Sequence, residues 1–256
     1  MGGTSKQFGI DEELTAPILK KLHEFSHINI AGIQIYMGTQ ILDESIITGN
    51  IRGIFDMASK IERLSGFRMK FIDLGGGFGV PYFKGEKHLD MESLRKGIKN
   101  VFDSYKDSGG FGGAGIIVES GRYITAECGY FLTKVLYKKT SRSKTYLIVD
   151  GGSNFHSAAA GIGRFVRNNF PVEVLTAEKN KETETVDIVG PLCTPSDLLA
   201  QSVEIPVCGK GDIIIFPKSG AYGLSASMNG FLSHPKPAEV MFEGMRFCIV
   251  GEKGKK

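Results

Sequence analysis

A run of glycines near residue 75 offers main-chain groups that a phosphate could approach. The largely apolar segment Phe71-Ile-Asp-Leu74 comes directly before Gly75, Gly76 and Gly77. Glycine has no Cβ, so consecutive glycines leave main-chain N–H groups bare, and such groups bind anions. A plain turn after a strand uses the same residue, so the glycines alone leave both interpretations open.

A second segment suited to phosphate is Glu119-Ser-Gly-Arg122, which follows the β-branched run Gly115-Ile-Ile-Val118. The guanidinium group of Arg122 can bind a phosphate through two parallel hydrogen bonds. In α/β barrels, ligands bind at the carboxyl ends of the strands, and phosphate sites follow the last two strands. Two such segments after successive strands therefore predict an anion site in the last part of a barrel.

Two residues with reactive side chains lie later in the chain. Cys193 lies in the loop Gly190-Pro-Leu-Cys-Thr194, and a lone cysteine is more often a small buried apolar residue than a catalyst. Tyr222 lies between Gly220 and Gly223, where its hydroxyl could contact a ligand or cap a turn. The residue types alone leave these alternatives open.

Two familiar motifs lack the structural context that their chemistry needs. His23-Glu-Phe-Ser-His27 matches the H-E-x-x-H zinc pattern, but a strand is predicted at once after it and no third ligand follows at a usual spacing. Gly110-Phe-Gly-Gly-Ala-Gly115 matches G-x-G-x-x-G, but it precedes a strand, whereas a dinucleotide site opens a helix. We therefore expect no metal site, with a zinc protease as an alternative, and a tight turn at the second motif.

The first half of the chain alternates between helix and strand patterns. Apolar residues at helical spacing predict helices over residues 12–26, 44–64 and 90–105, with Asp90 as a cap and Gly66 as a terminating glycine. Apolar, mostly β-branched runs predict buried strands over residues 28–36, 69–74 and 115–118. This alternation predicts parallel strands joined by crossover helices.

The second half changes to short β-rich segments separated by turn residues. We expect strands over residues 131–137, 145–149, 173–175, 185–189, 212–216 and 239–242. The change of pattern predicts two domains, residues 1–128 and 129–256, the second mainly antiparallel.

Composition and charge exclude several classes of protein. The 256 residues contain 31 Lys and Arg against 28 Asp and Glu, with the signs interspersed, so we expect no binding to nucleic acid. The sequence contains no apolar run of the ~18 residues that a membrane span needs and no apolar signal segment, which predicts a cytoplasmic protein. The four cysteines form no C-x-x-C pair, which argues against a disulfide framework.

Taken together, six ordered motifs resemble a known family. They are Tyr36-Met-Gly-Thr-Gln40, Asp73-Leu-Gly-Gly-Gly-Phe-Gly79, Glu119-Ser-Gly-Arg122, Asp150-Gly-Gly152, Gly190-Pro-Leu-Cys193 and Gly220-Ala-Tyr-Gly223. The chain resembles the fold-type III pyridoxal-phosphate decarboxylases, which include the diaminopimelate, ornithine and arginine decarboxylases. The resemblance implies the C-terminal part of an alanine-racemase-like (β/α)8 barrel, a following β domain, and pyridoxal 5'-phosphate as cofactor.

The resemblance also implies roles for individual residues. Its cofactor-binding set is Thr39, Gly75, Gly76, Gly77, Glu119, Ser120, Gly121, Arg122 and Tyr222. Most of these positions hold the cofactor phosphate, whereas Glu119 pairs with the pyridine nitrogen and keeps the ring protonated. Cys193 supplies a proton to the carbanion that decarboxylation leaves, usually across the interface of a homodimer.

Three positions depart from the family pattern. Tyr36 replaces a histidine that lies over the cofactor ring, where an aromatic side chain can still stack. Ser120 replaces a proline, and Thr194 replaces an acidic residue that binds the distal amine of the substrate. The surrounding sequence looks closer to a subgroup that includes the butirosin-pathway decarboxylase, whose glutamate is tethered to an acyl-carrier protein. We therefore expect an amino-acid substrate that is either free or carrier-bound.

The front of the chain lacks a family feature. No segment resembles the one with the lysine that holds the cofactor, and Thr4-Ser-Lys-Gln-Phe-Gly9 resembles a stretch found midway through the barrel. We therefore expect an incomplete enzyme, inactive and poorly stable alone, whose missing half a second polypeptide could supply. The alternative is a non-catalytic regulator like the antizyme-inhibitor relatives of ornithine decarboxylase.

Overall fold

The computed structural model describes residues 7–107, 113–163, 168–176 and 182–250. It divides into two compact units, Met1–Thr125 and Ala126–Lys256. This division lies close to the expected boundary between residues 128 and 129. Residues 110–112 of the G-x-G-x-x-G motif and residues 4–6 lie outside the described residues.

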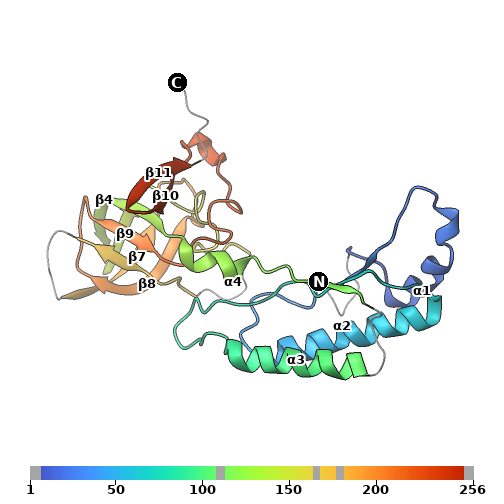
Figure 1. Cartoon of the computed structure of the whole chain (residues 1–256). Helices are drawn as coiled ribbons and strands as arrows, with labels where there is room; N and C mark the ends of the chain where they lie inside the picture. Colours follow the sequence, from blue (N-terminus) through green and yellow to red (C-terminus); the bar gives the residue numbers. More distant parts are fainter. Residues whose placement is uncertain (1–6, 108–112, 164–167, 177–181, 251–256) are drawn as a thin grey trace. The chain divides into compact units, whose positions relative to one another are not determined.

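The first unit contains a three-stranded parallel sheet in the order β1-β2-β3. Its elements are α1 (Glu12–Lys20), the 3-10 helix η1 (Leu22–Glu24), β1 (Gly32–Gln34), α2 (Glu44–Ser65), β2 (Phe71–Asp73), α3 (Met91–Asp107), β3 (Gly115–Ile117) and α4 (Arg122–Thr125). Helices α2 and α3 lie side by side along the strand segments (Figure 1). The predicted alternation of parallel strands and crossover helices is therefore confirmed.

Local capping explains where the two long helices begin and end. The carboxylate of Asp43 accepts hydrogen bonds from the main-chain N–H groups of Ser45 and Ile46 at 2.8 and 3.2 Å, and α2 begins there. The helix ends at Gly66, whose φ of 74° is left-handed. Asp90 begins α3 by accepting from the N–H of Glu92 at 3.0 Å. The predicted cap and the predicted terminating glycine are both confirmed.

The sheet is buried on one face only. Ile33, Ile72 and Ile116 are neighbours across the three strands and belong to the core formed with α2 and α3. On the other face, the side chain of Phe71 is 47% exposed and that of Ile117 is 42% exposed. The prediction of fully buried strands is therefore wrong, because helices cover only one face of this sheet in the described structure. The strands are also shorter than predicted.

The predicted helix over residues 12–26 is also shorter than expected. It ends at Lys20, and η1 follows after Lys21. His23 lies in η1 and His27 lies beyond it, so the two imidazoles do not share the face of an α-helix as a zinc motif requires. Within the described residues, no three His, Cys, Asp or Glu side chains gather in a metal-binding group.

The second unit contains a six-stranded sheet in the order β6-β9-β4-β5-β7-β8 and a separate hairpin. The elements are η2 (Ala126–Cys128), β4 (Phe131–Ser141), β5 (Lys144–Val149), β6 (Glu173–Leu175), β7 (Thr183–Val189), β8 (Leu198–Pro206), β9 (Ile213–Phe216), η3 (Phe231–Ser233), β10 (Glu239–Glu243) and β11 (Arg246–Val250). All pairs are antiparallel except β5 with β7. The mainly antiparallel domain is confirmed, but β8 and β11 were not predicted.

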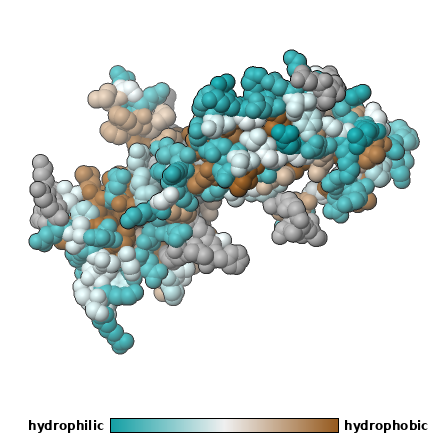
Figure 2. Space-filling view, turned by 90° about the horizontal axis from the view of Figure 1, so that it is seen from below, coloured by the Kyte–Doolittle hydropathy of each residue, from teal (hydrophilic) through white to brown (hydrophobic). Residues whose placement is uncertain are grey.

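Apolar side chains are exposed in both units, as the brown areas of Figure 2 show. The hairpin of β10 and β11 is an example, since Phe242 and Phe247 are 60% and 77% exposed. Their rings contact each other at a centroid distance of 4.8 Å. None of the helices in the described part of the chain combines the length and apolar character needed to cross a membrane.

Candidate functional site

The segments that follow β1, β2 and β3 meet at the carboxyl ends of these strands. The carbonyl oxygen of Gly75 accepts a hydrogen bond from the N–H of Glu119 at 2.8 Å. The carbonyl oxygen of Gly77 accepts from the N–H of Ile41 at 2.8 Å, and Phe78 forms a parallel bridge with Ile41. The structure therefore brings the glycine run next to the segments that contain Thr39 and Glu119.

Gly76 lies in the tightest contact of this junction. A Cβ at residue 76 would lie 2.3 Å from the carbonyl oxygen of Glu119, and one at Gly77 would lie 2.7 Å from the carbonyl oxygen of Gly38. Gly77 also has a φ of 94°. Only glycine fits these positions, and the loop presents main-chain atoms without side chains, as an anion cradle requires.

Arg122 begins α4 directly after this junction and is partly buried. Its Nη1 donates a hydrogen bond to the hydroxyl of Tyr82 at 3.5 Å, and its guanidinium carbon lies 5.7 Å from the centre of the Tyr82 ring. Tyr82 itself is buried, with 5% of its surface exposed. The aromatic ring therefore orients the guanidinium group of Arg122, three residues after Glu119.

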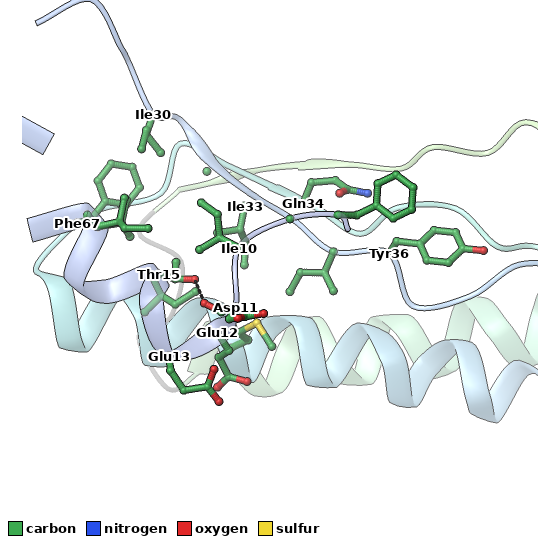
Figure 3. A pocket seen from close by; sticks show the side chains of 18 of the residues that line it. Ile10, Asp11, Glu12, Glu13, Thr15, Ile30, Ile33, Gln34, Tyr36 and Phe67 are labelled. Carbon is green, nitrogen blue, oxygen red and sulfur yellow. Dashed lines mark hydrogen bonds between the residues drawn. The ribbon is translucent and has the colours of Figure 1, made fainter. Parts of the chain in front are cut away.

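Glu119 is exposed and has one side-chain neighbour of note. The Nε2 of Gln34 donates to Oε2 of Glu119 at 3.4 Å. Both residues line a cavity of about 920 Å³ together with Tyr36. Figure 3 shows Tyr36 at one end of the cavity, Ile33 and Ile10 near its middle, and Ile30 and Phe67 at the other end. Thr39 lies just beyond, and its side chain is exposed.

Gln40 fastens the Thr39 segment to the loop that follows the glycines. Its side-chain amide donates to the carbonyl oxygen of Val80, and its Oε1 accepts from the N–H of the same residue at 3.2 Å. Gln34, Gln40 and Tyr82 were not among the predicted site residues. Gln40 directly follows the predicted residue Thr39, and this adjacency could have identified Gln40 from the sequence.

The second unit contains Tyr222 on a loop after β9. Tyr222 is 52% exposed and has a left-handed φ of 59°. The loop is held by Ser219, whose N–H donates to the carbonyl oxygen of Gly129 at 2.8 Å. The ring nitrogen Nε2 of His156 lies 2.8 Å from the hydroxyl oxygen of Ser219, and Nδ1 accepts from the N–H of Ala159 at 3.1 Å. The buried imidazole therefore supports the base of the Tyr222 loop.

Cys193 and Thr194 lie on a different loop of the second unit, between β7 and β8. Cys193 is exposed. The hydroxyl of Thr194 lies 2.9 Å from that of Ser196, so it already has a hydrogen-bond partner within the loop. The buried carboxylate of Asp197, which was not among the predicted site residues, closes this loop by accepting the N–H of Leu192 at 2.8 Å.

The predicted residues therefore form three groups. Those of the first unit come together at the strand ends, namely Tyr36, Thr39, Gly75, Gly76, Gly77, Glu119, Ser120, Gly121 and Arg122. In the second unit, Cys193 and Thr194 share one loop, and Tyr222 lies on another.

Comparison with known proteins relates the chain to enzymes. Residues 1–126 match the family described as "Pyridoxal-dependent decarboxylase, pyridoxal binding domain". The chain is 37% identical over 257 residues to L-glutamyl-[BtrI acyl-carrier protein] decarboxylase of Niallia circulans, covering 99% of this chain and 60% of that protein. It is 30% identical over 254 residues to diaminopimelate decarboxylase of Methanothermobacter thermautotrophicus, covering 98% of this chain and 57% of that enzyme.

Solved structures show the same fold. Diaminopimelate decarboxylase from Helicobacter pylori, complexed with L-lysine, superposes with a TM-score of 0.81 at 27% identity, covering 97% of this chain and 58% of that one. The enzyme from M. jannaschii, also with L-lysine, gives a TM-score of 0.83 at 26% identity, covering 96% of this chain and 55% of that one. The chain thus spans less than two thirds of the length of these relatives. Residues 1–126 belong to the family of pyridoxal-dependent decarboxylases.

Proposed function

We propose that this chain is a portion of a pyridoxal-phosphate-dependent carboxy-lyase that removes the α-carboxylate of an amino acid. Residues 1–128 are the C-terminal part of an alanine-racemase-like (β/α)8 barrel, and residues 129–256 are the β domain of that enzyme. The observation that carries the proposal is the contact of Gly76 with the carbonyl oxygen of Glu119, which keeps side chains out of the loop beside Arg122.

The residues of the first unit fit the phosphate of this cofactor. Gly75, Gly76 and Gly77 present main-chain atoms only, and Arg122 supplies a cation that suits a phosphate. The hydroxyl of Thr39 is exposed on the adjoining segment. The family resemblance supports Tyr222 as a further cofactor-binding residue of the complete enzyme.

When bound, pyridoxal phosphate would supply an acceptor for the electron pair that decarboxylation leaves on the α-carbon. The carboxylate of Glu119, whose Oε2 accepts from the amide of Gln34, would hold the protonated pyridine nitrogen. Tyr36 would offer an aromatic face to the cofactor ring. The thiol of Cys193 holds the proton that is delivered to the α-carbon.

The favoured substrate is an amino acid bound to an acyl-carrier protein, with free diaminopimelate as the competitor. Thr194 is neutral, and its hydroxyl is engaged with Ser196, so it offers no charge to a distal ammonium group. A tethered substrate has no free charge at that end. The relative that is 37% identical to the chain over 257 aligned residues acts, by its name, on a carrier-bound glutamyl group.

The complete enzyme is proposed to be a cytoplasmic homodimer in which Cys193 serves the site of the partner. All four cysteines are free, as is usual in a reducing compartment. An N-terminal half that carries the cofactor-binding lysine is proposed to join this chain, either within one longer polypeptide or as a second one.

The phosphate site is tested with this chain alone. Titration with pyridoxal phosphate and with pyridoxal, followed by tyrosine fluorescence, should show tighter binding of the phosphorylated compound. Arg122→Met should remove this difference, whereas Arg68→Met, which alters an exposed arginine elsewhere in the same unit, should leave it unchanged. Equal binding of both compounds by the parent chain would contradict the proposed site.

The activity is tested after joining the chain to the segment encoded upstream of it. Release of carbon dioxide from glutamyl-carrier protein should exceed release from free diaminopimelate, and Cys193→Ala should reduce it. A preference for diaminopimelate would contradict the inference, drawn from the neutral side chain of Thr194, that the substrate is bound to a carrier protein. If the assembled protein binds pyridoxal phosphate but releases no carbon dioxide from either compound, the chain belongs to a non-catalytic relative.

A further inference from the structure

The side chain of Asp197 connects two loops that are far apart in the sequence. Only 3% of its surface is exposed. Its Oδ1 accepts the N–H of Ser153 at 2.6 Å, and its Oδ2 accepts the N–H of Leu192 at 2.8 Å. Its main-chain oxygen accepts the N–H of Gly190 at 3.0 Å. One residue therefore fixes the loops that follow β5 and β7.

Two glycines make room for this carboxylate. A Cβ at Gly152 would lie 2.2 Å from Oδ1 of Asp197, and a Cβ at Gly190 would lie 2.3 Å from Oδ2. Neither position tolerates a side chain while the carboxylate stays in place. Gly152 of the segment Asp150-Gly-Gly152 and Gly190 of the segment Gly190-Pro-Leu-Cys193 are therefore explained by one buried side chain.

The same carboxylate fixes the turn that contains Cys193. The N–H of Leu192, the residue before Cys193, is held by Asp197. On the other side, the N–H of Asp197 donates to the carbonyl oxygen of Thr194 at 3.1 Å. The N–H of Thr194 closes the turn by donating to the carbonyl oxygen of Leu192 at 2.8 Å. Cys193 is thus exposed on a turn anchored on both sides by one residue.

We propose that Asp197 is a positioning residue that fixes the thiol of Cys193 for proton delivery, an inference that rests on the proposed function of Cys193. Main-chain hydrogen bonds to a buried carboxylate are short and strong, and they leave the exposed thiol on a rigid support. A displacement of ~1 Å in a reacting group can cost on the order of 10²-fold in rate, so the anchoring has catalytic consequences.

The variant Asp197→Asn tests the anchoring. Asparagine has nearly the same size, but its NH₂ group cannot accept the second main-chain N–H. The matched control is Asp187→Asn, which alters another buried carboxylate of the same unit, one that accepts the N–H of Ser202 at 2.7 Å. The other oxygen of Asp187 pairs with Lys144 at 3.6 Å, so Asp187→Asn removes a buried negative charge but keeps an oxygen that can accept the N–H of Ser202.

Hydrogen exchange on the chain measures the anchoring directly. In Asp197→Asn, at least one of the amides of Ser153 and Leu192 should exchange about 10-fold faster or more, because the asparagine oxygen can accept only one of these two N–H groups. In Asp187→Asn, faster exchange should be confined to the region of Ser202. Unchanged exchange at Ser153 and Leu192 in Asp197→Asn would overturn the inference.

Kinetics of the assembled decarboxylase measure the catalytic consequence. Asp197→Asn should lower kcat on the order of 10²-fold with little change in KM. Added to Cys193→Ala, it should cause no further loss, because the group that it positions is already gone. A merely structural role predicts instead that the two losses multiply. Asp187→Asn should keep its own small effect in both backgrounds.

The outcomes separate this inference from the proposed function. Full activity of Asp197→Asn, or losses that multiply, would overturn the positioning role while the decarboxylase assignment stands. If Cys193→Ala leaves decarboxylation unchanged, the proposed role of Cys193 fails, and the catalytic part of this inference fails with it. Exchange at Ser153 and Leu192 would still decide whether Asp197 holds the two loops.

Discussion

The backbone at Gly76 lies against the carbonyl oxygen of Glu119, leaving no space for a side chain between the ends of β2 and β3. This contact joins the glycine run to the segment that contains Arg122. It is supported by the hydrogen bond of 2.8 Å from the N–H of Glu119 to the carbonyl oxygen of Gly75. The two strand ends therefore keep their spacing only while residue 76 is glycine.

Gly76→Ala should weaken both the fold and the binding of pyridoxal phosphate. The new Cβ would lie 2.3 Å from the carbonyl oxygen of Glu119, so one of the two main chains must move. Overpacking of this kind costs about 1–3 kcal/mol. Urea denaturation should show the lower free energy of unfolding, and titration with the cofactor should show the weaker binding. Parent-like values in both measurements would contradict the tight junction.

Gly53→Ala provides the opposite case in the same unit. Gly53 lies within α2, and a Cβ there would meet no atom within 4 Å. Alanine should raise the free energy of unfolding by about 0.5–1 kcal/mol, because it restricts the unfolded chain and favours the helix. The same urea titration measures it, and cofactor binding should not change. A loss of stability would show that α2 is packed differently at this residue.

Gln40→Glu should loosen the segment that contains Thr39. The side chain then presents a carboxylate oxygen to the carbonyl oxygen of Val80, where an amide N–H was donating. Leaving such a group unpaired costs about 1–3 kcal/mol. The control is Gln201→Glu, because Gln201 is exposed and pairs with Asn169 only through its main chain. Thermal unfolding should separate the two variants, and equal midpoints would argue against the clamp.

Stability should fall at high pH because of Cys208. Burial raises the pKa of this thiol from 9.0 to about 11, and the carboxylates of Glu184 and Asp212 add to the shift. The pKa of the thiol is higher in the folded state than in the unfolded state. The contribution of the protonated thiol to the free energy of unfolding is therefore complete below pH 9 and is lost as the pH rises towards 11. Denaturation midpoints measured across this range should fall less steeply in Cys208→Ala.

Tyr105 is the control for this measurement. Burial and Asp56 raise the pKa of its hydroxyl from 10.0 to about 12. Ionisation of Tyr105 therefore also lowers the free energy of unfolding, but at still higher pH than ionisation of Cys208. Tyr105→Phe should remove that later loss and leave the effect of Cys208. An identical pH profile for the parent and Cys208→Ala would refute the role of the thiol.

Much of the fold was predictable because its signals are local. The apolar stripe of α2, the cap at Asp90 and the terminating Gly66 lie within single helices, and each was predicted at the observed place. Strand β8 was missed because it lies at the edge of its sheet, where exposed and buried residues follow no regular alternation. The one-sided burial of β1 and β2 depends on which elements cover each face of the sheet. The sequence of a single strand does not determine this.

The candidate site was predictable only in part. The resemblance identified the glycines, Glu119 and Arg122, whose roles stay proposals. Asp197 and Gln40 were missed because their partners are remote in the sequence, since Asp197 binds the N–H of a residue 44 positions away and Gln40 one 40 positions away. Such contacts exist only after folding. A polar side chain that binds a distant main chain has no local pattern to reveal it.

The single parallel pair of the second sheet has a consequence for the order of folding. Strands β5 and β7 run in the same direction, so the loops that follow them emerge at one edge, where Asp197 reaches both. Parallel strands need a long connection, and non-local pairing is slow compared with the closing of a hairpin such as β4 and β5. The turn that presents Cys193 should therefore be among the last parts of this unit to form during refolding.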